Sequence, residues 1–293
     1  MRRISVVVFL FLLGVVTAAA AQPAKPFKVF ISVDIEGITG IVNAEETSST
    51  GRDYEYFRRM MTKEASAAVE GARAAGATEI IVRDAHGSAR NIVPDVLDSG
   101  ARLLRDWSGG PKGMMEGVDE TFAAAIFIGY HAKAGTRDAL LEHTMTGSVM
   151  DVSINGVSMP EAGLNGLIAG TYGVPVVFVS GDKALCDQAK GLFGEVETVA
   201  VKEGIGAAAL NLHPDVAHQR IAAGVQKALG NLGRYKPYKL APPYTMVVKM
   251  KQEIPVYNAA LFPGMKRTGD WELTYTSDKV MDVIFMLEMV VLR

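Results

Sequence analysis

Six acidic and imidazole side chains are the residues of this chain whose types and spacing could do chemistry. They fall within about 130 residues of one another, in segments typical of strand ends and helix starts: Asp34, Glu36, His86, His131, His143 and Glu161. Carboxylate oxygens and imidazole nitrogens are ligands that divalent transition metals accept. The set is large enough to hold two metal ions and leave one group for chemistry, so the sequence indicates a metallohydrolase.

Asp34 and Glu36 are separated by one residue, so both carboxylates point to the same face of an extended chain. At a dry strand end, two neighbouring acids repel each other and need a cation. In a solvated turn, the same pair would be two ordinary surface acids. The pair alone leaves both interpretations open.

The histidines also carry alternatives. His86 follows Asp84 by two residues, and this acid could accept the second ring N–H of a metal-bound imidazole; a structural role for His86 is the other interpretation. His131 and His143 bracket a loop rich in glycine, alanine and charge. One of the two can bind metal while the other serves as acid, base or nucleophile.

Four residues, among them Glu161 of the candidate set, look structural from the sequence alone. Glu161 follows a proline at the start of an expected helix, where an acid already interacts favourably with the helix dipole. His213 and His218 lie on a polar helix start and are expected at the surface. Cys186 is the only cysteine and has no histidine beside it, so we expect a buried thiol and no internal disulfide.

Three β-rich runs must position the candidate ligands. Residues 28–34, 78–83 and 123–130 each end in polar residues, and a helix over 54–75 connects the first two runs. Strands that alternate with helices predict an α/β fold with a parallel sheet. Ligands of such sheets bind beyond the carboxyl ends of the strands, which is where three of these runs place metal-type side chains.

The rest of the chain extends this fold and then changes character. The sequence predicts a hairpin around Asn155 and Gly156, followed by further strands, helices and an extended linker: 149–154, 157–159, 161–172, 174–180, 182–193, 196–201, 213–230 and 235–243. A small βαβα-like unit is expected from 244–249, 271–275 and 278–292. We therefore predict a layered α/β/α domain with a largely parallel or mixed central sheet over residues 22–212, and a smaller α+β unit over 213–293.

Composition narrows the function further. The first residues are positive, residues 4–16 are mostly apolar, and small residues precede Gln22, as in a secretory signal peptide cleaved after Ala21. We expect an exported protein, periplasmic or secreted; a retained membrane anchor is the alternative, although the apolar run is short for a bilayer. The formal net charge of -2 argues against a nucleic-acid partner.

Five ordered motifs resemble the zinc-dependent D-aminopeptidase family of DppA type. They cover nearly the whole chain after the leader: Ser32-Val33-Asp34-Ile35-Glu36-Gly37-Ile38-Thr39-Gly40, Asp84-Ala85-His86, Gly129-Tyr130-His131-Ala132, Glu142-His143-Thr144-Met145 and Glu161-Ala162-Gly163-Leu164-Asn165. The resemblance implies release of N-terminal D-amino acids from short peptides. It also implies assembly into a ring-like homo-oligomer, with a decamer as the expected size.

The same resemblance assigns the site. It implies two zinc ions per subunit, with His143 as the catalytic residue and five metal ligands: Asp34, Glu36, His86, His131 and Glu161. Only the resemblance makes Glu161 a ligand, and Asp34 is the expected bridge between the ions. The leader is a departure from the cytoplasmic members of this family.

Three rival functions use the same residues differently. A dinuclear phosphoesterase would share such ligands but would want cationic phosphate clamps, for which Lys133 and Arg137 are the candidates. A hydrolase of L-peptides or other amides would keep the metal site and change the substrate. A periplasmic metal-binding or peptide-binding protein would bind its ligand without turnover.

Overall fold

The first and larger sheet has seven strands in the order β3-β2-β1-β4-β7-β8-β9. The computed structural model describes residues 26–291. The strands of this sheet are parallel except for β9, which pairs antiparallel with β8. Their bounds are β1 Lys28–Val33, β2 Glu79–Asp84, β3 Arg102–Leu104, β4 Ala124–Tyr130, β7 Val176–Asp182, β8 Glu197–Ile205 and β9 Ala208–Asn211.

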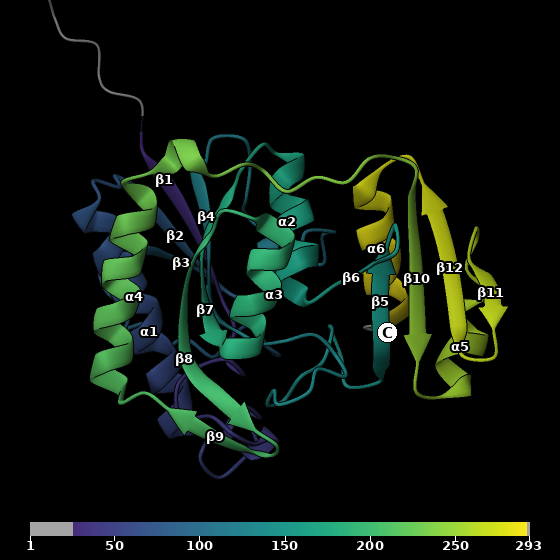
Figure 1. The fold of residues 1–293 in the computed structure, drawn as a ribbon, viewed down its shortest axis with the longest axis horizontal. Coiled ribbons are helices and arrows are strands. Elements are labelled where there is room, and N and C mark those ends of the chain that lie inside the picture. The colour runs from purple at the N-terminus through teal and green to yellow at the C-terminus, as the bar shows by residue number, and fades with distance from the viewer. Residues whose placement is uncertain (1–25, 292–293) are drawn as a thin grey trace, which may run out of the picture.

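Helices cover both faces of this sheet, which explains why its central strands are apolar along their whole length (Figure 1). On one face, α1 (Tyr54–Ala74) packs against α4 (Pro214–Leu229). On the other lie α2 (Glu161–Thr171) and α3 (Lys183–Phe193). The Asp182 side chain caps α3 by accepting from the N–H of Leu185 at 2.8 Å, and His213 with Pro214 begins α4.

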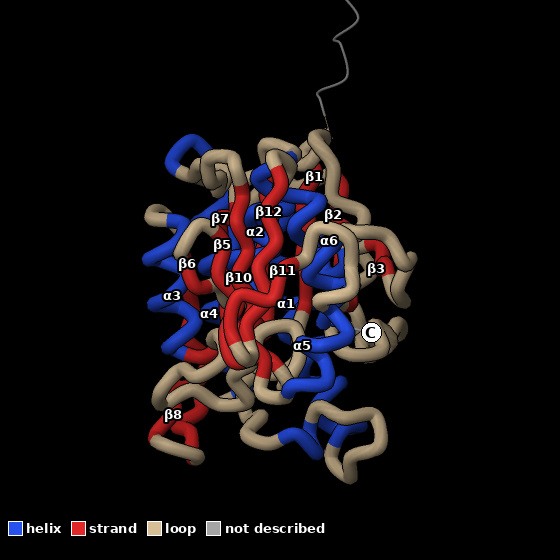
Figure 2. Tube along the Cα trace, turned by 90° about the vertical axis from the view of Figure 1, so that its right-hand side faces the viewer, coloured by secondary structure: helices blue, strands red, loops and turns tan. Residues whose placement is uncertain are grey.

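A second sheet of five antiparallel strands, in the order β11-β12-β10-β5-β6, stands beyond α2 (Figures 1 and 2). Its strands are β5 Val149–Ile154, β6 Val157–Ser158, β10 Tyr244–Met250, β11 Lys266–Gly269 and β12 Glu272–Ser277. The helices that accompany it are α5 (Glu253–Ala259) and α6 (Val280–Val291), and α6 contacts α2. Short 3-10 helices occur at Ala44–Glu46, Gly113–Met115 and Leu232–Arg234.

The predicted fold class is confirmed: a mostly parallel α/β layer structure with a smaller α+β unit. Strands β5 and β6 precede residue 212 in the chain but belong to the second sheet. Helix α4 follows residue 212 but packs against α1, which covers the first sheet. As a domain division, the boundary near residue 212 stays a prediction. The expected leader, residues 1–21, lies outside the described residues, and over 26–291 no helix combines the length and apolar character needed to cross a bilayer.

Candidate metal centre

The structure brings all six predicted site residues together at the carboxyl end of the first sheet. Asp34 follows β1, His86 lies two residues beyond β2, and His131 follows β4. These three strands are neighbours in the order β2-β1-β4, so their ends deliver the side chains to one place. Glu36 comes from the turn after β1.

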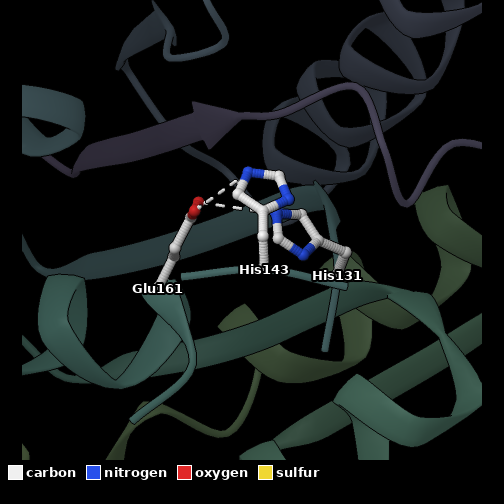
Figure 3. Close-up of side chains that lie close together, drawn as sticks. All are labelled: His131, His143 and Glu161. Carbon is white, nitrogen blue, oxygen red and sulfur yellow. Dashed lines mark ion pairs between the residues drawn. The ribbon is translucent and has the colours of Figure 1, made fainter. Parts of the chain in front are cut away.

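The remaining two residues reach the site from the side of the second sheet. His143 lies in the long loop between β4 and β5, and Glu161 is the first residue of α2, directly after the β5–β6 hairpin. Figure 3 shows the imidazoles of His131 and His143 side by side with the Glu161 carboxylate facing them. The backbone N–H of Met145 donates to Glu161 Oε1 at 2.7 Å, which ties the loop to the helix.

Two glycines and a buried lysine hold the turn after β1. The N–H of Gly37 donates to the carbonyl of Gly129 at 2.7 Å, and a Cβ on Gly37 would overlap the backbone of Tyr130. Only glycine allows this close approach. From β8, the buried Lys202 donates through Nζ to the carbonyls of Glu36 and Ile41. The turn that carries Glu36 is therefore fixed from both sides.

Each imidazole faces at least one carboxylate. His86 Nδ1 lies 3.3 Å from Asp34 Oδ1 and 3.0 Å from Glu36 Oε2. His131 Nε2 lies 3.6 Å from both Asp34 Oδ2 and Glu161 Oε2. His143 Nε2 lies 3.5 Å from Glu161 Oε1, and its ring stacks on that of His131 with centroids 4.2 Å apart.

The other nitrogen of each imidazole is bound to a backbone carbonyl. His86 Nε2 lies 3.1 Å from the carbonyl of Thr47, His131 Nδ1 lies 2.9 Å from that of Ala132, and His143 Nδ1 lies 2.8 Å from that of Leu141. A carbonyl only accepts, so these three nitrogens carry protons. In the neutral rings, the nitrogens that face the carboxylates then carry no proton. Such a nitrogen can donate its lone pair to a metal ion.

Several polar atoms at the centre of the cluster are buried and unsatisfied. Asp34 Oδ2, Glu36 Oε2 and His131 Nε2 have no hydrogen-bond partner within residues 26–291. Such atoms are costly unless something binds them. Two groups of three residues could each hold a metal ion, and they share His131. Asp34, Glu36 and His131 form one group, and His131, His143 and Glu161 form the second. Within each group, one ligand atom from every residue lies within 4.8 Å of the other two. The donor chemistry fits divalent metal ions.

The crowding of acids shifts the pKa values. Burial, reinforced by the charge of Glu36, raises the pKa of Asp34 to about 8. Burial, the largest single influence, would raise the pKa of Glu36, but the charge and hydrogen bond of His86 together with the charges of His131 and His143 outweigh burial and hold that pKa well below its usual range. For His131, burial acts to lower the pKa, but the contact with Glu161 together with the charges of Glu36 and Asp34 outweighs burial and raises the pKa to about 10. The site therefore needs positive charge among its carboxylates.

A cavity of about 450 Å³ gives access to the cluster. Its walls combine four of the predicted site residues with apolar and small side chains: Asp34, Ala85, His86, Gly87, Trp107, Met114, His143, Met145, Thr146 and Glu161. Glu36 and His131 are almost fully buried and do not line it. The protein encloses the cluster except on the side of this cavity, and catalytic metal sites keep such an open side for water and substrate.

The expected role of Asp84 is wrong. Its carboxylate accepts from the N–H groups of Asn91 and Ile92 and from the Asn91 side chain, which in turn donates to the carbonyl of His86. The backbone carbonyl of Thr47 takes the position on the imidazole that Asp84 was expected to fill. A carbonyl leaves no mark in the sequence, so this partner was not predictable.

Of the residues expected to be structural, His213 and Cys186 lie as predicted, whereas His218 is more buried than expected. His213 is exposed and caps α4 by accepting from the N–H of Asp215, and His218 is half-buried on the same helix. Cys186 is buried, and burial raises the pKa of its thiol to about 12. The role of Lys202 in holding the turn after β1 was not predicted from the sequence. The signal that could have indicated it is a lysine directly after the apolar residues of a strand.

Comparison with known proteins identifies relatives over most of the chain. A model of the D-aminopeptidase family, peptidase family M55, matches residues 27–289. The D-aminopeptidase of Bacillus subtilis (strain 168) is 35% identical over 263 residues, which cover 87% of this chain and 93% of the relative.

A solved structure shares the fold. The Zn-dependent D-aminopeptidase DppA from Bacillus subtilis, a self-compartmentalizing protease, superimposes with a TM-score of 0.87 at 31% identity, covering 90% of this chain and 96% of the other. The resemblance inferred from the five motifs is thus confirmed by sequence and by structure. The chain belongs to the D-aminopeptidase family, peptidase family M55.

Proposed function

We propose that this protein is a zinc aminopeptidase that releases N-terminal D-amino acids from short peptides. Family membership gives the reaction class, and the relative of known structure is zinc-dependent. One observation carries the proposal. Buried oxygen and nitrogen atoms of Asp34, Glu36 and His131, without hydrogen-bond partners in the described part of the chain, converge next to an open cavity that Asp34 lines.

Two zinc ions would be held by Asp34, Glu36, His86, His131 and Glu161. The two oxygens of Asp34 face different histidines, Oδ1 toward His86 and Oδ2 toward His131, which supports Asp34 as the bridging ligand. Bound zinc would supply a Lewis acid for the scissile carbonyl and lower the pKa of the attacking water.

His143 would handle protons or attack the substrate. It lines the cavity, and its side chain is 23% exposed, whereas that of His131 is fully buried. The contact of Nδ1 with the Leu141 carbonyl leaves Nε2 free on the side of Glu161 and the cavity. A partly exposed imidazole in a fixed tautomer is suited to general acid or base catalysis.

The phosphoesterase alternative finds little support in the cavity. Its described lining contains no lysine or arginine. Arg137 is 92% exposed and pairs with Asp138, and Lys133 lies 3.9 Å from Asp151. Neither is placed to clamp a phosphate beside the cluster.

A stereoisomer panel tests the proposal. The full chain, reconstituted with zinc, is assayed with D- and L-dipeptide amides, with D-alanyl p-nitroanilide and with p-nitrophenyl phosphate. We expect turnover of the D-amide and the D-anilide alone. Preference for L-substrates would contradict the proposed specificity for D-amino acids. Hydrolysis of p-nitrophenyl phosphate would favour a phosphoesterase. Tight binding of peptide without turnover would favour a binding protein.

Assembly and location complete the proposal. The relative of known structure is self-compartmentalizing, which supports a homo-oligomer, and a decamer is the size we propose for this chain. Because of the leader-like residues 1–21, we also propose export with cleavage after Ala21. N-terminal sequencing of the mature protein from its native compartment would test the cleavage, and a retained leader would contradict it.

A further inference from the structure

A second cavity adjoins the one that opens onto the metal cluster. Its volume is about 360 Å³, and it shares four wall residues with the first cavity: Gly87, Trp107, Met114 and Met145. Its remaining walls come from the loop after Trp107, from the start of the 3-10 helix Gly113–Met115 and from helix α6: Ser108, Gly109, Gly110, Gly113, Phe285, Glu288 and Met289. A group bound in one cavity therefore lies directly beside a group bound in the other.

Trp107 forms a fixed wall between the two cavities. Its Nε1 donates to the carbonyl of Gly87 at 2.8 Å, and the guanidinium of Arg83 lies 4.6 Å from its ring centroid. Arg83 is itself fully buried and donates to the carbonyl of Asp106 at 2.6 Å. A tryptophan that is 42% exposed yet held from two sides is preorganised to contact a ligand.

Among the described residues, Glu288 is the one ionisable side chain in the lining of the second cavity. A Cβ on Gly113 would overlap Glu288 Oε1, so the glycine allows the carboxylate to lie against the loop. Across residues 26–291, no cation and no hydrogen-bond donor contacts this carboxylate; its charged neighbour is Glu116. Burial, reinforced by Glu116, raises the pKa of Glu288 to about 7. A ligand cation would pair with a carboxylate that no residue of the described range 26–291 pairs.

We infer that the second cavity binds the N-terminal residue of the peptide, with its side chain against Trp107 and the methionines and its α-ammonium on Glu288. The inference rests on the proposed function, because an aminopeptidase must recognise a free amine. The carboxylates of the cluster, Asp34, Glu36 and Glu161, already face histidines. Glu288 is left to read the charge, while the apolar walls read the side chain.

Binding without turnover tests the inference. In a His143→Ala background, calorimetry compares D-alanyl-D-alanine with D-lactyl-D-alanine, which has a hydroxyl group in place of the ammonium. Glu288→Gln should weaken the ammonium ligand about 10- to 100-fold, the range expected for a lost hydrogen bond to a charged group, and leave the hydroxyl ligand unchanged. An ammonium preference that survives Glu288→Gln would overturn the inference.

Two comparisons sharpen the result. Asp282→Asn makes the same acid-to-amide change on the same helix, where Asp282 accepts from the Ser277 hydroxyl at 2.8 Å, and should leave the preference intact. If Glu288→Gln weakened only peptides with an N-terminal D-lysine, the carboxylate would read a side chain and the inference would be overturned. A wild-type protein that bound D-alanyl-D-alanine but hydrolysed nothing would contradict the proposed function alone.

In turnover, the same change should act on KM. With D-alanyl p-nitroanilide and the otherwise wild-type enzyme, Glu288→Gln should raise KM about 10- to 100-fold while kcat changes little, because the ammonium contact is the same in ground and transition states. A loss confined to kcat would instead give Glu288 a role in the chemical step and contradict simple amine recognition.

Discussion

At the scale of single residues, the three histidines of the cluster share one arrangement. Each binds a backbone carbonyl through one ring nitrogen and turns the other toward carboxylates. The tautomer is therefore set by the backbone and not by acids, which is why Asp84 could be misassigned from the sequence. The six site residues could be picked out from the sequence because their chemistry is in the side chain, whereas the backbone carbonyls that bind the imidazoles are common to every residue.

Loss of Asp34 should cost metal. Its carboxylate lies between His86 and His131, so Asp34→Ala removes two oxygens from the centre of the cluster. We expect zinc content, measured by elemental analysis after dialysis, to fall by at least one ion per subunit. The exposed acid Asp95 provides the matched control, because Asp95→Ala should leave zinc content unchanged. Full zinc occupancy in Asp34→Ala would remove Asp34 from the ligand set.

Loss of His143 should cost activity and spare metal. We expect His143→Ala to retain both zinc ions and to lower kcat about 100-fold or more, the scale of a missing general acid or base. Because His143 also belongs to one of the two candidate metal groups, the zinc content must be measured on the same sample. A variant that lost one zinc ion would show that His143 is a ligand.

At the scale of elements, the sequence predicted the strands that matter most for the site. β1, β2 and β4 lie within a residue of the predicted ranges, because their long apolar runs end abruptly in polar residues. The short elements β3, β9, β11 and α5 were missed. Each has too few residues for a periodic pattern to develop, so pairing with longer neighbours determines them.

Lys202 links strand β8 to the site. From β8, it donates to the carbonyls of Glu36 and Ile41, so Lys202→Met would leave two buried acceptors unsatisfied. At about 1–3 kcal/mol for each such group, we expect a loss of roughly 2–6 kcal/mol in the free energy of unfolding, measured by urea titration. Zinc affinity should fall as well, because Glu36 is no longer held.

The exposed Lys183 at the start of α3 offers the comparison for that change. Its Nζ contacts Asp187 at the surface, so Lys183→Met should change stability by less than about 1 kcal/mol. If Lys202→Met unfolded no more easily than this control, Lys202 would not be what holds the turn after β1.

At the scale of the whole molecule, the second sheet joins two distant parts of the chain. Strand β5 pairs with β10, so Ile154 lies opposite Met246. The hairpin at Asn155 and Gly156 could be predicted from its turn residues, because turn preferences are local. The pairing of its strand β5 with β10 could not be predicted, because the two strands are far apart in the sequence. The same pairing places Glu161, directly after the hairpin, against the ends of the first sheet.

The proposed assembly predicts a use for an apolar surface on α5. Ile254 and Tyr257 on α5, and Leu261 two residues beyond its end, are 62–73% exposed, while Val256 and Ala259 are buried. We expect a second copy of the chain to cover this stripe, so Ile254→Ser with Tyr257→Ser should lower the mass of the oligomer measured by light scattering. Tyr56→Ser, which changes an equally exposed residue of α1, is the control. An unchanged mass would mean that assembly uses another face.

The fixed position of Trp107 has an optical consequence. The chain has two tryptophans, and the other, Trp271, lies on the second sheet side and is 50% exposed. In a Trp271→Phe background, all indole emission would come from the partition between the two cavities. Zinc loading and peptide entry would then each perturb the same fluorophore from opposite sides, and stopped-flow mixing could resolve their order without an attached dye.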